Sequence, residues 1–222
     1  ADLAIHSAKD MPAMKTDGLE HIYFIEGKSR KISDLLIFKK GMEAMYKKNM
    51  KLGTSSLRRK MQAKYHLHSN DIHPLNGNID TRLKKLDDGF YDCIILAEAG
   101  LSRLDYLLND HNFIKLNHMT CSGQGALSVQ WKVGSKIEKF LKPFFANYSS
   151  DDLNLGINME RELLRKLEAN CNSAISLNVS NGILNGEIYG KDKFITFSGK
   201  NVDEIFNNIR KGEGLRLLHE HY

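Results

Sequence analysis

The chain has 222 residues, of which 41% are hydrophobic and 27% are charged. This is the composition of an ordinary globular protein, long enough for one large domain or two to three small ones with hydrophobic cores. Its longest apolar runs, such as Cys93–Ala97, have the length of a strand and fall far below the roughly 20 residues of a membrane helix. We therefore expect no membrane span.

The formal net charge of +5 fits either a nucleic-acid partner or an acidic small substrate. The three cysteines, Cys93, Cys121 and Cys171, are odd in number and lack CxxC spacing. That pattern argues against a disulfide scaffold and against a zinc site, and it favours a reducing compartment. We expect no metal and a cytoplasmic location, or a plastid or other organelle if the source is eukaryotic.

The chain opens on Ala1-Asp2-Leu3-Ala4-Ile5, without an initiator Met, a basic region or a cleavage site. These residues have the pattern of an apolar strand that has already begun. We therefore expect the sequence to be a fragment, or to lack its opening segment.

The first half of the chain alternates strands with short helices. Apolar runs predict strands at Leu3–Ile5 and His21–Ile25. After them, the regular alternation predicts right-handed βαβ units and a parallel sheet. The expected elements are a strand near Met50–Leu52, a helix over Ser56–Tyr65, a strand over Asp71–Leu75, a helix over Ile79–Leu86, a strand over Asp92–Ala97 and a helix from Glu98.

The second half changes character near residue 149. Before it, the pattern predicts a strand over Ala126–Trp131 and a helix over Ser135–Phe145, and Asp151 marks the start of a helix that extends to Leu167. After it, Asn-Gly and Gly-Lys-Asp turns separate short strands, which predicts a smaller α+β domain. Its expected elements are strands over Ile175–Val179, Ile183–Tyr189 and Phe194–Phe197 and a helix over Val202–Leu218.

Three strand-to-helix junctions carry anion-binding residues. In a parallel sheet such junctions lie at one edge, where helix N-terminal N–H groups and side chains can bind carboxylates or phosphates. Arginine suits this task because its planar guanidinium makes bidentate contacts. Any one arginine is an ordinary solvated helix residue in the alternative interpretation, but the coincidence at three junctions favours a site. The junctions are Gly53–Ser56 before Arg58 and Arg59, Asn76–Asn78 before Arg82, and Glu98–Gly100 before Arg103.

Two further features carry chemistry of their own. Asp10, directly after the first strand and next to Lys9, can stabilise a cation or move protons, although a Lys-Asp pair is more often a surface turn. Cys93 lies in an apolar strand and is predicted to be core, whereas Cys121 fits either role. Cys171, in a polar loop, is accessible enough to carry a covalent group or is an ordinary loop cysteine.

Taken in order, these motifs resemble the hydroxymethylbilane synthase family, also called porphobilinogen deaminase. The order and spacing of the matching stretches over more than half of the chain make the resemblance specific. They are Ala4–Pro12, Gly53–Arg59, Gly77–Leu83, Leu86–Asp92, Ile94–Leu104 and Gly123–Ala126.

The resemblance implies a transferase of tetrapyrrole and haem synthesis. Such an enzyme joins four porphobilinogen molecules head to tail with loss of ammonia, and then releases hydroxymethylbilane by hydrolysis. Growth takes place on a dipyrromethane cofactor, which the resemblance attaches through a thioether to Cys171. It makes Asp10 the catalytic aspartate, which stabilises positive pyrrole nitrogens and helps proton transfer. It implies cofactor binding by Ser7, Lys9, Thr54, Ser56, Arg58, Arg59 and Arg82, and substrate binding by Gly77, Arg103, Gln124 and Ala126.

The resemblance also implies an α/β protein of three domains. Two of them are similar to the halves of periplasmic ligand-binding proteins, and the small α+β third domain carries the cofactor cysteine. The first comprises residues 1–27 and 122–146 and lacks its N-terminal part, the second comprises 28–121, and the third 147–222. Members are typically monomers.

The sequence departs from the family pattern at several places. Asn76 stands where an arginine is usual, Ala169-Asn170 replaces two glycines, and Asn172-Ser173-Ala174 replaces Gln-Val-Pro after the cysteine. The family's opening segment does not precede Ala1, so we expect little or no turnover from these residues alone.

Two other classes of function are alternatives. A non-catalytic two-lobed protein that binds small carboxylates would dispense with Asp10 and Cys171 and carry no covalent group; an inactive truncated synthase is a related outcome. A nucleic-acid-binding protein is disfavoured because no aromatic residues alternate with the arginines.

Overall fold

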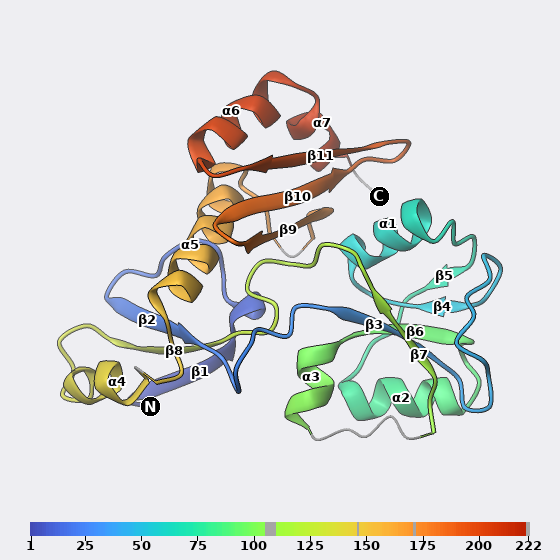
Figure 1. Cartoon of the computed structure of the whole chain (residues 1–222), viewed down its shortest axis with the longest axis horizontal. Helices are drawn as coiled ribbons and strands as arrows, with labels where there is room; N and C mark the ends of the chain where they lie inside the picture. Colours follow the sequence, from blue (N-terminus) through green and yellow to red (C-terminus); the bar gives the residue numbers. More distant parts are fainter. Residues whose placement is uncertain (105–109, 146, 171, 221–222) are drawn as a thin grey trace. The chain divides into compact units, whose positions relative to one another are not determined.

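The computed structural model describes residues 1–104, 110–145, 147–170 and 172–220 (Figure 1). The chain divides into two compact units, which we call unit 1 (Ala1–Lys31 with Met119–Tyr222) and unit 2 (Ile32–His118). Each mixes sheets with helices, which confirms the α/β class. Among the described residues, no helix is long and apolar enough to cross a membrane.

Unit 2 is built on a five-stranded sheet with the order β5-β4-β6-β3-β7. Strand β4 is parallel to β5 and β6, which confirms the predicted parallel pairing of these three strands, whereas β3 and β7, which were not predicted, add antiparallel pairs of β3 with β6 and with β7. The βαβ rule applies to strands joined through a helix, and no helix leads into β3. The elements are β3 Asp34–Phe38, β4 Leu52–Gly53, α1 Leu57–His66, β5 Ile72–His73, α2 Ile79–Asp87, β6 Cys93–Ala97, α3 Glu98–Arg103 and β7 Phe113–Leu116.

Helices cover both faces of this sheet. Side chains that alternate along β3 and β6 divide between a cluster with α2 and α3 and a cluster with α1. This explains why β3 and β6 are continuous apolar runs. Cys93 is wholly buried in the α1 cluster, which confirms it as a core residue, and burial raises the pKa of its thiol to about 12.

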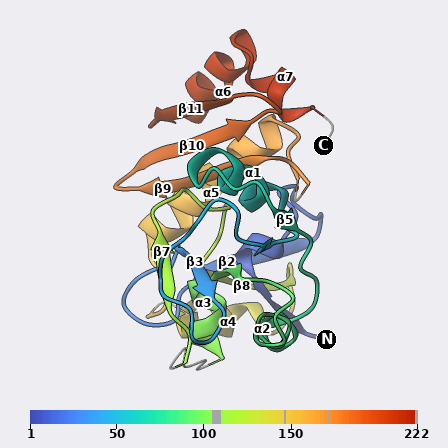
Figure 2. The ribbon, with the colours of Figure 1, turned by 90° about the vertical axis from the view of Figure 1, so that its right-hand side faces the viewer.

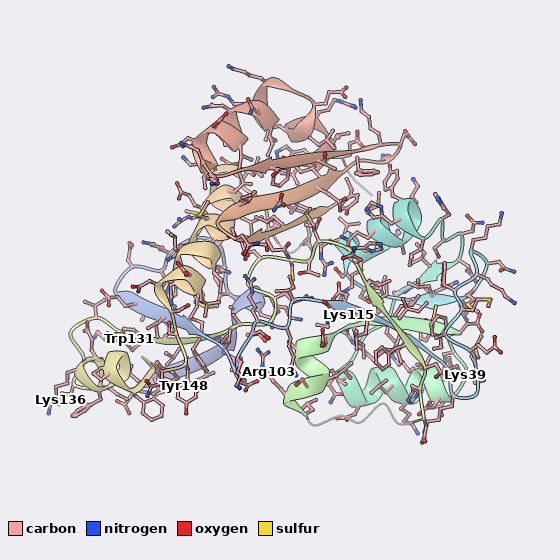
Figure 3. The ribbon with its side chains drawn as sticks, viewed as in Figure 1. Lys39, Arg103, Lys115, Trp131, Lys136 and Tyr148 are labelled. Carbon is pink, nitrogen blue, oxygen red and sulfur yellow. The ribbon has the colours of Figure 1, made fainter. Side chains whose placement is uncertain are left out.

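Unit 1 contains two antiparallel sheets. The first has the order β1-β8-β2, and its Trp131 packs with Leu141 and Phe145 of α4 (Figure 3). A short 3-10 helix, η1, follows β1 directly. The elements are β1 Leu3–Ser7, η1 Ala8–Asp10, β2 Leu19–Phe24, β8 Leu127–Lys132, α4 Glu138–Phe145 and α5 Asp151–Lys166.

The second sheet of unit 1 is the predicted C-terminal α+β part. Helices α5, α6 and α7 contribute to one apolar cluster with its strands, and Figure 2 shows α6 and α7 beside β11. The predicted single helix Val202–Leu218 is wrong, because the chain turns extended at Gly212 and Gly214 lies close to Ile209. The elements are β9 Ile175–Ser180, β10 Ile183–Tyr189, β11 Phe194–Gly199, α6 Val202–Lys211 and α7 Gly214–Leu218.

The glycine-rich turn before β8 packs closely on η1. Gly123 has a φ of +72°, and a Cβ there would lie 2.8 Å from the carbonyl carbon of Ala8 and 2.9 Å from the nitrogen of Lys9. The N–H of Ala8 donates to the carbonyl of Ala126 at 3.0 Å. The turn therefore fixes the backbone from which Asp10 projects.

We expect Gly123→Ala to destabilise the protein more than Gly134→Ala does. Both glycines have positive φ, but Gly134 (φ +74°) has open space around it, whereas Gly123 does not. The shared left-handed backbone costs about 1–2 kcal/mol, and crowding at Gly123 adds about 1–3 kcal/mol. Urea unfolding of the two variants measures the difference, and equal losses would contradict the close packing of this turn.

Candidate functional site

The first junction of unit 2 brings two arginines into the first turn of α1. The Oγ of Ser56 caps this helix by accepting from the N–H of Arg59 at 3.5 Å, and the Oγ1 of buried Thr54 accepts from the N–H of Ser56 at 3.3 Å. Such a cap supplies an acceptor for an N–H that the helix leaves unpaired. The residues after Gly53 thus set where α1 begins and where Arg58 and Arg59 lie.

Both arginines bind the same buried carboxylate, that of Asp34 at the start of β3. Arg59 donates through Nη2 at 2.6 Å and Nε at 3.1 Å, and Arg58 through Nη1 at 2.9 Å. Arg59 also donates to the carbonyl of Ile95 at 3.1 Å, and Arg58 to Gln62 at 2.8 Å. One negative charge therefore faces two positive ones, and this group of side chains favours a further anion.

The second junction adds Arg82 to this group. Asn78 caps α2 by accepting from the N–H of Thr81 at 2.9 Å, and the Nε of Arg82 donates to the carbonyl of Gly77 at 2.7 Å. Burial, and then the charge of Arg59, lower the pKa of Arg82. Its Nη groups have no hydrogen-bond partner among the residues that the structure describes, so Arg82 has donors to offer a carboxylate.

Ser55 and Asn76 join the two junctions directly. The hydroxyl of Ser55 donates to the Oδ1 of Asn76 at 2.7 Å and accepts from the N–H of Leu75 at 2.8 Å. Lys85 donates to the carbonyl of Asn76 at 3.0 Å. The amide at position 76 therefore takes part in aligning the ends of β4 and β5.

Arg103 does not lie at the start of its helix. It is the last residue of α3 (Figure 3), whereas Glu98 at the first position forms an ion pair with Lys115 at 3.0 Å. The parallel strand β6 places the third junction at the predicted edge of the sheet. The substrate-binding role of Arg103 stays a prediction.

In unit 1, Arg161 holds the segment that carries Asp10. From α5, its guanidinium donates to the carbonyls of Ala8 at 3.0 Å, Met11 at 2.5 Å and Pro12. These acceptors lie on both sides of Asp10, whose own side chain and that of Lys9 are exposed, while Ser7 occupies the cap position of η1. Arg161 therefore fixes the backbone around the predicted catalytic aspartate.

Glu160, the residue before Arg161, organises the neighbouring turn. Its side chain is wholly buried and accepts from Arg30 at 2.8 and 3.0 Å, from the N–H of Gly123 at 2.8 Å and from the N–H of Val179 at 2.9 Å. Arg30 donates in addition to the carbonyl of Gln124 at 2.7 Å. One carboxylate thus ties the glycine turn to the C-terminal sheet.

The other predicted residues have differing surroundings. Gln124 and Ala126 are buried, and the Oε1 of Gln124 accepts from the Cys121 thiol at 3.3 Å. Cys171 lies outside the described residues; next to it in the chain, the N–H of Asn172 donates to the Oδ1 of Asn170 at 2.8 Å. The described residues contain no group of three or more side chains that could hold a metal ion.

Sequence reasoning missed four residues that organise these sites: Arg30, Asp34, Glu160 and Arg161. A signal existed for two of them, because Glu160 and Arg161 follow Ile157 at spacings of three and four, on the buried stripe of α5. Charged residues on such a stripe indicate a buried polar network.

Comparisons with known proteins agree with the residue pattern. A sequence profile described as "Porphobilinogen deaminase, dipyromethane cofactor binding domain" matches residues 1–138. The porphobilinogen deaminase of Prochlorococcus marinus is 35% identical over 220 residues, covering 96% of this chain and 67% of that one. The probable porphobilinogen deaminase of Methanocaldococcus jannaschii is 37% identical over 131 residues, covering 59% and 44%. A solved amino acid transporter substrate-binding protein from Streptococcus pneumoniae matches with 18% identity and a TM-score of 0.33, covering 64% and 56%.

We expect Asp34→Asn to lower the free energy of unfolding by about 3 kcal/mol, because it leaves two buried guanidiniums without their shared charge. The matched control is Asp92→Asn, because the half-buried carboxylate of Asp92 accepts from the backbone N–H of Lys51 at 2.8 Å and has no ion pair among the described residues. That variant is expected to lose about 1 kcal/mol. Urea unfolding compares the two, and similar losses would show that Asp34 does not hold the arginines.

Proposed function

The chain belongs to the porphobilinogen deaminase family, and we propose that its residues carry out the hydroxymethylbilane synthase reaction. The family consists of transferases of tetrapyrrole synthesis. In the proposed reaction, four porphobilinogen molecules are joined head to tail with loss of ammonia, and hydroxymethylbilane is released by hydrolysis. The chain spans about two thirds of the Prochlorococcus relative, 67%, so the activity is proposed for the protein that these residues belong to.

The observation that carries the proposal is the group formed by Arg58, Arg59 and Arg82 in unit 2. Arg58 and Arg59 share the single carboxylate of Asp34, and Arg82, whose pKa is lowered by burial and then by the charge of Arg59, adds a third guanidinium, so positive charge is in excess where helix N-termini also point. Porphobilinogen brings two carboxylates, and arginine binds carboxylates with a bidentate geometry. A lengthening chain of such units requires several fixed cations, which this group supplies.

The same residues fit the dipyrromethane cofactor. Its acetate and propionate groups match the donor set, and the Nη groups of Arg82 lack a partner among the described residues. In unit 2, Arg58, Arg59, Arg82, Thr54 and Ser56 would hold it. When bound, the cofactor supplies the pyrrole to which the first substrate is joined. In unit 1, Ser7 and Lys9 are proposed to contribute, and Cys171, outside the described residues, to form the thioether.

Asp10 is proposed to stabilise positive charge on the reacting pyrroles and to move protons. Its carboxylate is exposed beside Lys9, and Arg161 and the Gly123 turn hold the backbone that carries it. A fixed carboxylate needs little reorganisation when charge develops next to it. One such acid can therefore serve every round of a repeated reaction.

We further propose the three domains 1–27 with 122–146, 28–121 and 147–222, a monomeric state, and action in the cytoplasm. The division is supported by the three sheets, β1-β8-β2, the five-stranded sheet of unit 2, and β9 to β11, each of which has apolar clusters of its own. Gln124, Ala126, Gly77 and Arg103 are proposed to act in substrate binding.

Intact-mass spectrometry tests cofactor attachment. Protein purified from cells that make porphobilinogen is expected to carry a two-pyrrole increment, which Cys171→Ser abolishes and which Cys121→Ser retains. Cys121 is a suitable control because its thiol already donates to Gln124. A folded but unmodified wild-type protein would contradict the proposal and favour a non-catalytic carboxylate-binding protein.

Turnover of porphobilinogen tests the role of Asp10. Asp10→Asn keeps the size of the side chain and removes its charge, so kcat/KM is expected to fall by about 10²–10⁴-fold. The control Asp17→Asn changes an exposed carboxylate in the turn before β2 and leaves turnover within about twofold. Equal rates in the two variants would exclude Asp10 from catalysis.

A further inference from the structure

Three polar side chains lie in a row across the first sheet of unit 1. The strand register pairs Ser128 of β8 with His6 of β1 on one side and with Tyr23 of β2 on the other. The His6 Nε2, Ser128 Oγ and Tyr23 hydroxyl are buried and have no hydrogen-bond partner among the described residues. Buried polar atoms are rarely left unpaired, and such a row indicates a ligand or ordered water nearby.

A cavity of about 270 Å³ lies beside this row, and Tyr23 forms part of its wall. The segment 11–16 that follows Asp10, strands β2 and β8, and helix α5 enclose it. His21 lies next to Tyr23 on the same face, with their ring centroids 4.8 Å apart. This volume lies just below the roughly 300–1,000 Å³ of drug-sized ligand sites, which favours a small ligand.

The wall of the cavity is positively charged. Lys15, Arg161 and Arg165 line it with Glu20 as the acid, which leaves three positive charges against one negative. Burial, and then the charges of Arg161 and Lys15, lower the pKa of His21, so this ring is neutral at pH 7. Burial raises the pKa of Tyr23, which keeps its hydroxyl a hydrogen-bond donor.

We propose that this cavity binds a small anion with carboxylate or phosphate oxygens. Lys15 and Arg165 supply charge, and the Tyr23 hydroxyl supplies a donor that is unpaired among the residues that the structure describes. Arg161 connects the site to the Asp10 segment, because its guanidinium both lines the cavity and donates to the carbonyls of Ala8 and Met11. All residues that line the cavity belong to unit 1.

Titration with inorganic phosphate and with succinate, at constant ionic strength against chloride, tests the proposal. The NMR signal of the His21 ring, assigned with His21→Gln, is expected to shift and saturate at millimolar anion. Lys15→Gln combined with Arg165→Gln should weaken binding at least tenfold, and Tyr23→Phe about two- to tenfold. The double variant Lys200→Gln with Lys211→Gln removes the same charge from exposed positions and should bind as wild type does.

The outcomes separate the sources of the anion. Saturation by phosphate alone assigns the site to phosphates, and saturation by succinate assigns it to carboxylates; both support the proposal. Absence of saturation up to about 100 mM of either anion, or equal weakening in the two double variants, overturns it. Because the readout is binding and leaves Asp10 unchanged, the result is independent of whether the protein condenses porphobilinogen.

Discussion

The adjacent pair Glu160 and Arg161 on α5 is the constraint on which unit 1 depends. Both side chains are buried, and a buried charge is tolerated only where hydrogen bonds replace its water. Glu160 finds them in Arg30 and in two backbone N–H groups, and Arg161 finds them in three backbone carbonyls. These two adjacent residues thereby fix the glycine turn, strand β9 of the C-terminal sheet and the segment that carries Asp10.

Unit 2 also depends on a buried charged side chain, but there the buried group that binds its neighbours is a carboxylate. There a single buried acid, Asp34, binds two arginines, so the three side chains together carry an excess of one positive charge. In unit 1 the arginine holds a backbone, and Asp10, the proposed catalytic acid, remains exposed. In both units a buried charge therefore fixes the groups around it, and removal of a buried charge alone is expected to be strongly destabilising.

The sequence predicted the elements better than their partners. Strands β9 to β11 and helices α1, α2 and α5 lie close to their expected ranges, because apolar periodicity and capping residues are local signals. Strand β3 was missed and its direction could not be inferred, since no helix precedes it. The binding of Arg58 and Arg59 by Asp34 could not be predicted either, because Asp34 lies 24 and 25 residues before these arginines in the chain.

The predicted arginines also differ in how many of their side-chain N–H groups already bind other residues, and their sequence motifs did not indicate this difference. The Nε and both Nη groups of Arg59 donate to Asp34 and Ile95. Arg59 would therefore attract a bound anion mainly through its positive charge at the edge of the sheet. Arg82 uses Nε alone, on Gly77, and is the better placed to contact a carboxylate directly. The amide of Asn76 is engaged by the hydroxyl of Ser55, so the proposed direct binding of carboxylates at this edge relies more heavily on Arg82.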